Sequence, residues 1–461
     1  MLKQTLVVLA SAALVGVSPA AATASPIGGS APGRSAHCWG IDRIDVPGAQ
    51  VQRTACLPDL TTASTVASGH TDPNDWAGLH AVGTTNPSGV PGVQVDGYFP
   101  DTSTTNTHHG WNHDSQFVIR LPDHWNGGLV ITGAPGVRTQ YANDFIVSDW
   151  VLAQGYAFAS TDKGNSGTTF YEDGLEPGDA ISEWNYRVTE LTLATKAVAK
   201  QAYGEETSRT FMFGISNGGY LTRWQLENNP SLYDGGIDWE GTLFTPQTNL
   251  LTYLPTALRN YPAYKATGDA AAHDAIIRAG FAPGSEFLWD FHYSYYWDLT
   301  QRIYREELDP AYDGDLKAGI PFCPSGTPNC DADYDLATRP PSVKQAIERI
   351  SLTGRIGKPM LTLHGTLDAL LPISTDSDVY DQMIDNAGRG NLHRYYRIED
   401  GNHVDGLFGA FPTQLRPMLP CARTAFTALE AWTGRPRVAP PADATIANPG
   451  SGDLLNTCSL E

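Results

Sequence analysis

The chain has 461 residues, and its 50 acidic and 30 basic side chains give a formal net charge of −20. Such a surface repels the phosphates of nucleic acids and the headgroups of anionic membranes, so we expect neither as a partner. With 41% hydrophobic residues the chain can bury a large core, which excludes intrinsic disorder as its overall state.

The first residues have the pattern of a secretory signal peptide over 1–24. Lys3 precedes an apolar run from Leu6 to Val17, and Ala22-Thr23-Ala24 is typical of a cleavage site with small residues. This run is too short to span a membrane, and no later stretch has about 18 consecutive apolar residues. We therefore expect a secreted protein.

The cysteine content agrees with export, because the chain has six cysteines, an even number. Six cysteines favour three disulfides, which allow about 15 connectivities. Proximity along the chain favours the pairs Cys38–Cys56, Cys323–Cys330 and Cys421–Cys458.

After the signal peptide, an N-terminal extension over 25–110 is rich in Gly, Ser, Thr and Pro and predicts loops with a few short strands. From residue 111 to 244, apolar runs and helical periodicity alternate, as in the first part of a core domain. The expected strands are 117–121, 129–132, 156–160 and 210–213. The expected helices are 144–154, 182–203 with Ser182 as its N-cap, and 217–228.

The segment 245–350 breaks this alternation and is rich in Tyr, Trp, Asp and Pro, which is typical of an inserted cap. Alternation resumes over 351–432, the second part of the core, and a Pro- and Ala-rich tail follows over 433–461. This second part has expected strands at 360–363 and 394–398 and helices at 376–386 and 414–432. The order of elements predicts an α/β fold whose mostly parallel, doubly wound sheet is covered on both faces.

The sequence Gly214-Ile215-Ser216-Asn217-Gly218 lies between an expected strand and an expected helix. A serine in G-x-S-x-G at such a junction sits on a tight turn, where the flanking glycines avoid clashes with neighbouring backbone. The turn exposes the hydroxyl, and the start of the helix favours negative charge. Ser216 is therefore the candidate nucleophile.

A serine nucleophile needs a histidine base and an acid that orients the base. Asp368 and His403 each follow an expected strand, at the edge where parallel sheets place their sites, and their order after Ser216 is Asp then His. The oxyanion of the intermediate needs two donors. The N–H of Asn217 is one, and because Pro135 cannot donate, the N–H of Ala134 is the other, with Gly136 as second choice.

These segments resemble the α/β-hydrolase superfamily from about residue 117 to 432. Within it, the segments WNGGLVITGAPG, WVLAQGYAFASTDKGN and GISNGGY are similar to secreted tannase and feruloyl-esterase-like enzymes and to hydrolases of hydroxybutyrate oligomers. The tannase and feruloyl esterase pattern has disulfide-bonded cysteines beside the nucleophile and the histidine. Here Ile215 and Val404 occupy those positions. The resemblance implies a serine esterase.

An aromatic run over 287–297 gives the cap a second expected role. Trp289 and Trp297 would line the substrate site and set ester preference, although such rings also serve simply to pack a cap. The cap is also rich in aspartates, which either hold a structural Ca²⁺ or are solvated loop carboxylates. These aspartates are Asp309, Asp313, Asp315, Asp331, Asp333 and Asp335.

The sequence therefore predicts a secreted serine hydrolase that cleaves soluble aromatic or hydroxyalkanoate-type esters or oligomers through an acyl-enzyme, with no cofactor in the reaction. Its activity should decline below about pH 6 as His403 is protonated. Two alternatives stay open. A peptidase or amidase uses the same triad, and a binding module on a degenerate hydrolase fold would use none of it.

Overall fold

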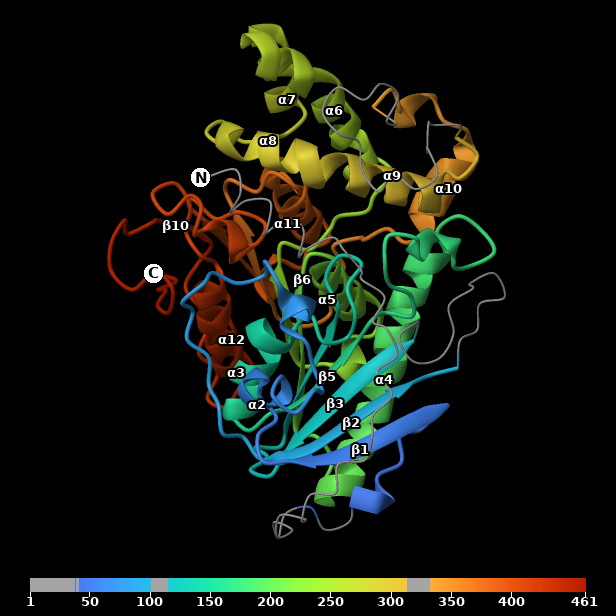
Figure 1. Cartoon of the computed structure of the whole chain (residues 1–461), viewed down its shortest axis with the longest axis vertical. Helices are drawn as coiled ribbons and strands as arrows, with labels where there is room; N and C mark the ends of the chain where they lie inside the picture. Colours follow the sequence, from blue (N-terminus) through green and yellow to red (C-terminus); the bar gives the residue numbers. More distant parts are fainter. Residues whose placement is uncertain (1–37, 39–40, 101–114, 313–331) are drawn as a thin grey trace.

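The computed structural model describes residue 38 and residues 41–100, 115–312 and 332–461 (Figure 1). The expected signal peptide and the expected Cys323–Cys330 pair lie outside the described residues. No helix in the described part of the chain is both long enough and apolar enough to cross a membrane.

A single sheet of ten strands runs through the described residues, in the order β1-β2-β3-β5-β4-β6-β7-β8-β9-β10. At one side, β1, β2, β3 and β5 pair antiparallel, whereas all pairs from β5 to β10 are parallel. The strands are β1 Val51–Leu57, β2 Gly92–Tyr98, β3 Gln116–Pro122, β4 Gly128–Gly133, β5 Ala157–Thr161, β6 Arg209–Ile215, β7 Gly235–Trp239, β8 Met360–Gly365, β9 His393–Ile398 and β10 Ala444–Ile446. This sheet confirms the expected fold class.

Helices cover both faces of the sheet, as Figure 1 shows with α12 and α4 on opposite sides. One face packs against α3 (Asp149–Ala153) and α12 (Leu419–Thr433), with Phe426 against the rings of Tyr156 and Phe211. The other face packs against α4 (Asp179–Tyr203), α5 (Asn217–Asn228) and α11 (Ser377–Asn386). Central strands β4, β5, β7 and β8 are buried along their whole length, as apolar runs covered on both sides should be.

The segment between β7 and β8 forms a helical layer above the sheet (Figure 1). Its helices are α6 Leu250–Thr267, α7 Ala270–Arg278, α8 Glu286–Tyr295, α9 Trp297–Leu308 and α10 Pro341–Arg349. They lie where the sequence predicted an inserted cap, and we use the name cap for residues 245–350.

Several elements differ from the expectations. The extension contains a short helix α2 (Thr62–Thr65) and two seven-residue strands, β1 and β2, which join the main sheet. Helix α4 begins at Asp179 with Gly178 as its N-cap, so the expectation for Ser182 is wrong; Ser182 Oγ donates to Gly178 O within the first turn. Strand β7 was not expected, because its sequence Gly-Gly-Ile-Asp-Trp shows no clear strand pattern.

The tail is tied to the sheet and to the loop that carries His403. Strand β10 extends the sheet beside β9, and beyond it Glu399 N donates to Ile446 O at 3.1 Å. The backbone N–H of Asn448 donates to Glu399 Oε2 at 2.7 Å, and its amide donates to Asp400 Oδ2 at 2.9 Å. The disulfides Cys421–Cys458 and Cys38–Cys56 confirm two of the three expected pairs. The first of them anchors the tail to α12.

Candidate active site

Ser216 occupies the sharp turn between β6 and α5, with φ 58° and ψ −122°. Few residues other than glycine adopt this left-handed region, so the surrounding backbone must hold the turn in place. A Cβ on Gly214 would overlap Gly218 O, and a Cβ on Gly218 would lie 2.7 Å from Gly133 O. The glycines of the motif are therefore required by close approach of the backbone, and Ser216 is partly exposed at the carboxyl end of β6.

The three residues singled out in the sequence meet at the carboxyl ends of β6, β8 and β9. His403 Nε2 lies 3.1 Å from Ser216 Oγ, and His403 Nδ1 lies 2.8 Å from Asp368 Oδ2. Asp368 is held in turn by the backbone N–H groups of Leu370 and Leu371, which donate to its Oδ1 at 2.7 and 2.9 Å. This is the arrangement of nucleophile, base and orienting acid in a serine hydrolase.

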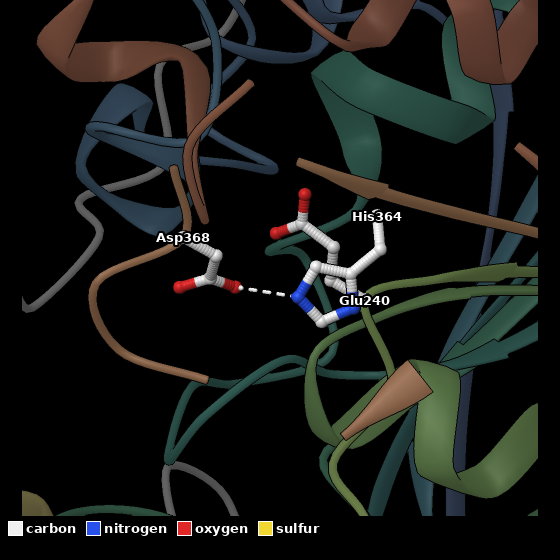
Figure 2. Close-up of side chains that lie close together, drawn as sticks. All are labelled: Glu240, His364 and Asp368. Carbon is white, nitrogen blue, oxygen red and sulfur yellow. Dashed lines mark ion pairs between the residues drawn. The ribbon is translucent and has the colours of Figure 1, made fainter. Parts of the chain in front are cut away.

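Two further ionisable side chains surround the acid, and neither was singled out in the sequence (Figure 2). Glu240 follows β7 and is fully buried, with Oε2 3.3 Å from His403 Nδ1. His364, at the end of β8, places Nε2 3.3 Å from Asp368 Oδ2. Glu240 could have been found only by recognising β7 as a strand, because its loop would then lie next to the loop of Asp368.

Glu240, His364 and Asp368 are close enough to suggest a metal site, since their ligand atoms lie within 4.8 Å of one another. The hydrogen bonds of His364 argue against it. Nε2 lies 2.9 Å from Leu371 O, an acceptor, so this nitrogen carries the proton. Nδ1 lies 2.7 Å from Ser377 Oγ, which also accepts from Arg223. Both nitrogens are in use, and the cluster is a hydrogen-bonded network.

The buried ionisable groups around His403 shift one another's pKa values. Burial disfavours the charged form of His403, but Asp368 and Glu240 outweigh this and raise the pKa of His403 to about 10. This shift contradicts the expected decline of activity below about pH 6, because His403 is then protonated at higher pH. Burial and the charge of Asp368 raise the pKa of Glu240 to about 8. Burial alone would raise the pKa of Asp368, but His403 and His364 hold it well below its ordinary value. Asp368 is thus the carboxylate that stays ionised beside His403.

The structure corrects one of the two expected oxyanion donors. The N–H of Asn217 is at the first position of α5, where a helix supplies no acceptor, and it stays a candidate. The N–H of Ala134 instead donates to Thr161 O at 2.9 Å, as a continuation of the β4–β5 pairing, so it cannot serve an oxyanion. Gly136, the second choice, lies beside the turn, because its carbonyl accepts from Asn217 Nδ2 at 2.9 Å.

The expectation that Trp289 and Trp297 form the substrate surface is also corrected. Both side chains are fully buried, and both indole N–H groups are used within the protein. Trp289 Nε1 donates to Ser285 Oγ at 2.9 Å inside the cap, whereas Trp297 Nε1 donates to Ala369 O at 2.7 Å. Both side chains pack within the cap. The hydrogen bond of Trp297 also connects the cap to Ala369, the residue that follows Asp368.

Other cap residues approach the centre. On α9, Tyr304 bonds the side chain of Asn217, with its hydroxyl 2.6 Å from Nδ2 and 2.9 Å from Oδ1. Gln301 lies between Trp297 and Tyr304 on the same helix face, and neither polar atom of its buried amide has a partner in the described structure. His292 on α8 is also buried with both nitrogens unpartnered. Burial lowers the pKa of His292 to about 3, against the opposing effect of Asp368.

The expected calcium ligands are only partly described, since Asp313, Asp315 and Asp331 lie outside the described residues. Asp309 accepts from Arg339 Nε at 2.5 Å and from Tyr334 Oη at 3.1 Å. Asp335 caps a short helical turn by accepting from Ala337 N. Asp309 and Asp335 thus have protein partners of their own.

Comparisons with known proteins agree with this architecture. Residues 102–249, which include Ser216 but neither Asp368 nor His403, match the family model described as "Tannase and feruloyl esterase". A probable feruloyl esterase from Arthroderma benhamiae is 26% identical over 172 residues, which is 36% of this chain and 31% of that protein. The match thus spans about a third of that relative.

Among solved structures, feruloyl esterase B from Aspergillus oryzae superposes with a TM-score of 0.50 at 15% identity, covering 87% of this chain and 90% of that one. An esterase from the same organism gives a TM-score of 0.49 at 12% identity, covering 88% and 90%. Identity at this level supports the fold alone. The chain has an α/β-hydrolase fold, and its segment 102–249, with the nucleophile turn, resembles the tannase and feruloyl esterase family.

Proposed function

We propose that this protein is an exported serine hydrolase that cleaves carboxylic esters through an acyl-enzyme. The observation that carries the proposal is the continuous chain of hydrogen bonds from Ser216 Oγ through His403 to Asp368. The family match over 102–249 supports an ester over an amide as the substrate, and the name of the curated relative favours esters of aromatic acids.

In this mechanism Ser216 Oγ attacks the ester carbonyl carbon while its proton moves to His403 Nε2. The new imidazolium keeps its Nδ1 proton, hydrogen-bonded to Asp368, and the N–H groups of Asn217 and Gly136 bind the oxyanion. When the C–O bond breaks, the leaving alcohol takes the proton from Nε2. Water then attacks the acyl-enzyme with His403 again as base, which releases the acid and restores Ser216. These steps use side chains and backbone of this chain alone.

Hydrolases of the tannase type with paired cysteines tie the nucleophile turn to the histidine loop by a disulfide. In this chain Ile215 is buried in the apolar cluster beneath α12, and Val404 packs against the same cluster. Both positions thus belong to the same apolar environment, in place of a disulfide.

Replacing the nucleophile tests the proposal. Ser216→Ala should lower kcat/KM for aromatic esters by at least about a thousandfold, because the triad acts as a unit, while the melting temperature is unchanged. Ser231→Ala, an exposed serine in a turn after α5, is the matched control and should keep full activity. A fluorophosphonate probe should label the wild type at Ser216 only, as located by peptide mapping.

Retention of more than about a hundredth of wild-type activity in Ser216→Ala would identify another nucleophile. Parallel assays of p-nitrophenyl esters and p-nitroanilides separate the esterase from the alternative peptidase. A wild-type protein that reacts with neither substrate nor probe would support the binding-module alternative.

A further inference from the structure

Two carboxylic acids share one nitrogen of the catalytic histidine. His403 Nδ1 lies 2.8 Å from Asp368 Oδ2 and 3.3 Å from Glu240 Oε2. The two acids follow β8 and β7, which are neighbouring parallel strands, so their loops emerge side by side at the carboxyl edge of the sheet. A serine triad requires only one such acid. The second one has no role in the mechanism derived above.

Glu240 is held in this position by its backbone and by its other oxygen. Its φ of 50° is unusual for a residue other than glycine, and its N–H donates to Leu363 O at 2.9 Å. Oε1 accepts from the N–H of Gly365 at 2.8 Å, which leaves Oε2 turned towards His403. Within the described residues, Oε2 makes no other hydrogen bond and no ion pair with a lysine or arginine. Its environment consists of the two histidines and Asp368.

We propose that Glu240 is a second acid of the active site, a positioning residue that holds the His403 ring together with Asp368 and can orient it when Asp368 is removed. This inference rests on the proposed function, since it concerns the same histidine. Two carboxylates buried beside one imidazole repel each other, so at neutral pH one of them keeps a proton. The raised pKa of Glu240 identifies it as the protonated partner.

The proposal predicts a specific change in the pH dependence of kcat/KM. Glu240 faces His403, Asp368 and His364, and beyond them His292 and Asp376 act on the same groups. Coupled groups release their protons in two macroscopic steps, so the acid limb of kcat/KM in the wild type should be broad. In Glu240→Gln the amide cannot titrate, so the negative charge that Glu240 gains above about pH 8, and that raises the pKa of His403, is gone. The acid limb of kcat/KM should then become a single ionisation step, at lower pH than in the wild type.

The experiment compares Glu240→Gln, Asp368→Ala and the double variant across pH. Glu240→Gln alone should lower kcat/KM about threefold to tenfold, whereas in the Asp368→Ala background the same change should cost at least about a hundredfold, because Glu240 is then the only acid on His403. Glu307→Gln is the matched control, since this buried glutamate on α9 has a raised pKa and bonds the N–H of Ile181. It should leave the acid limb unchanged.

Glutamine can keep the bond to the N–H of Gly365, and melting temperature and fluorophosphonate labelling show whether each variant is folded. Equal fold-changes in the two backgrounds, together with an unmoved acid limb in Glu240→Gln, would overturn the proposal. The experiments distinguish failure of this inference from failure of the proposed function. Activity in Ser216→Ala would refute the serine mechanism. Loss of activity in Ser216→Ala, together with unchanged kinetics in Glu240→Gln, would refute only the role of Glu240.

Discussion

Trp297 shows how one side chain links the cap to the chemistry without touching the reacting atoms. Its indole N–H donates to the carbonyl of Ala369, directly after the acid Asp368. Trp289 has the same burial and a bonded indole, but its partner is Ser285, in the same cap. Both tryptophans therefore pack the cap, whereas only Trp297 also supports the loop that carries Asp368.

We expect Trp297→Phe to lower kcat/KM about threefold to tenfold for every ester tested, because one hydrogen bond to the acid loop is lost and its geometry loosens. Trp289→Phe should reduce the melting temperature to a similar extent and leave kcat/KM unchanged. Steady-state kinetics on a panel of esters and thermal unfolding measure both effects. Equal kinetic loss in the two variants would contradict this role for Trp297.

The sequence predicted Ser216, Asp368 and His403 because each follows an expected strand in a fixed chain order, and that information is local. Glu240 follows a strand without a clear pattern, and its proximity to His403 depends on how two strands pair. The role of Ala134 was predicted wrongly for a related reason. Whether a backbone N–H is free depends on its sheet partner, which no local pattern shows.

At the scale of elements, helices α8 and α9 bring two polar side chains to the centre at a cost in stability. Gln301 and His292 are buried without partners, and a buried amide without hydrogen bonds costs about 1–3 kcal/mol. Gln301 lies between residues that bond the acid loop and Asn217. We therefore expect both side chains to bond a polar group of the proposed ester substrate.

Gln301→Leu should therefore keep or raise the melting temperature while lowering kcat/KM for esters that carry a hydroxyl group, by about fivefold or more relative to unsubstituted esters. His292→Phe should act in the same direction, because its depressed pKa keeps it a neutral hydrogen-bonding group at the working pH. A substrate panel with matched hydroxylated and plain esters measures the ranking. An unchanged ranking in both variants would assign them to packing.

The helical core elements were predictable because their apolar residues recur with helical spacing, and α5 has the expected bounds, Asn217–Asn228. The cap was predicted from a break in pattern, but the sequence did not predict its helices, since aromatic residues pack in any element. The sequence did not predict β1 and β2 as strands of the main sheet, because buried polar residues interrupt the apolar pattern. Gln94, for example, is buried and accepts a hydrogen bond from Arg120.

For the whole molecule, buried carboxyl groups make folding stability depend on pH. Burial raises the pKa of Asp149 and of Asp405 to about 7 and that of Glu240 to about 8. The folded state then holds protons that the unfolded chain has already released, so stability is lost as pH rises through these values. Burial lowers the pKa of Lys163 to about 7, which acts in the opposite direction. Glu183, whose pKa burial raises to about 10, acts in the same direction as the three carboxyl groups.

We expect the melting temperature to fall by at least about 2 °C between pH 6.5 and pH 8.5, as the buried carboxyl groups ionise. The measurement should be repeated in 0.5 M NaCl (about five times the salt that gives a 10 Å Debye length), which screens surface repulsion from the net charge but not buried groups. Lys163→Met removes the opposing group and should steepen the decline. A melting temperature that is level or rises over this range would contradict the assignment.

The tail that flanks the histidine loop also sets the order in which the active site can be completed. Ribosomes make Ser216, Asp368 and His403 before β10, Asn448 and Cys458, so the contacts that brace the histidine loop are the last to become available. The disulfide that anchors them to α12 also forms only where oxidation is permitted. The contacts that brace the histidine loop are therefore complete only after the whole tail has been made and Cys458 has been oxidised.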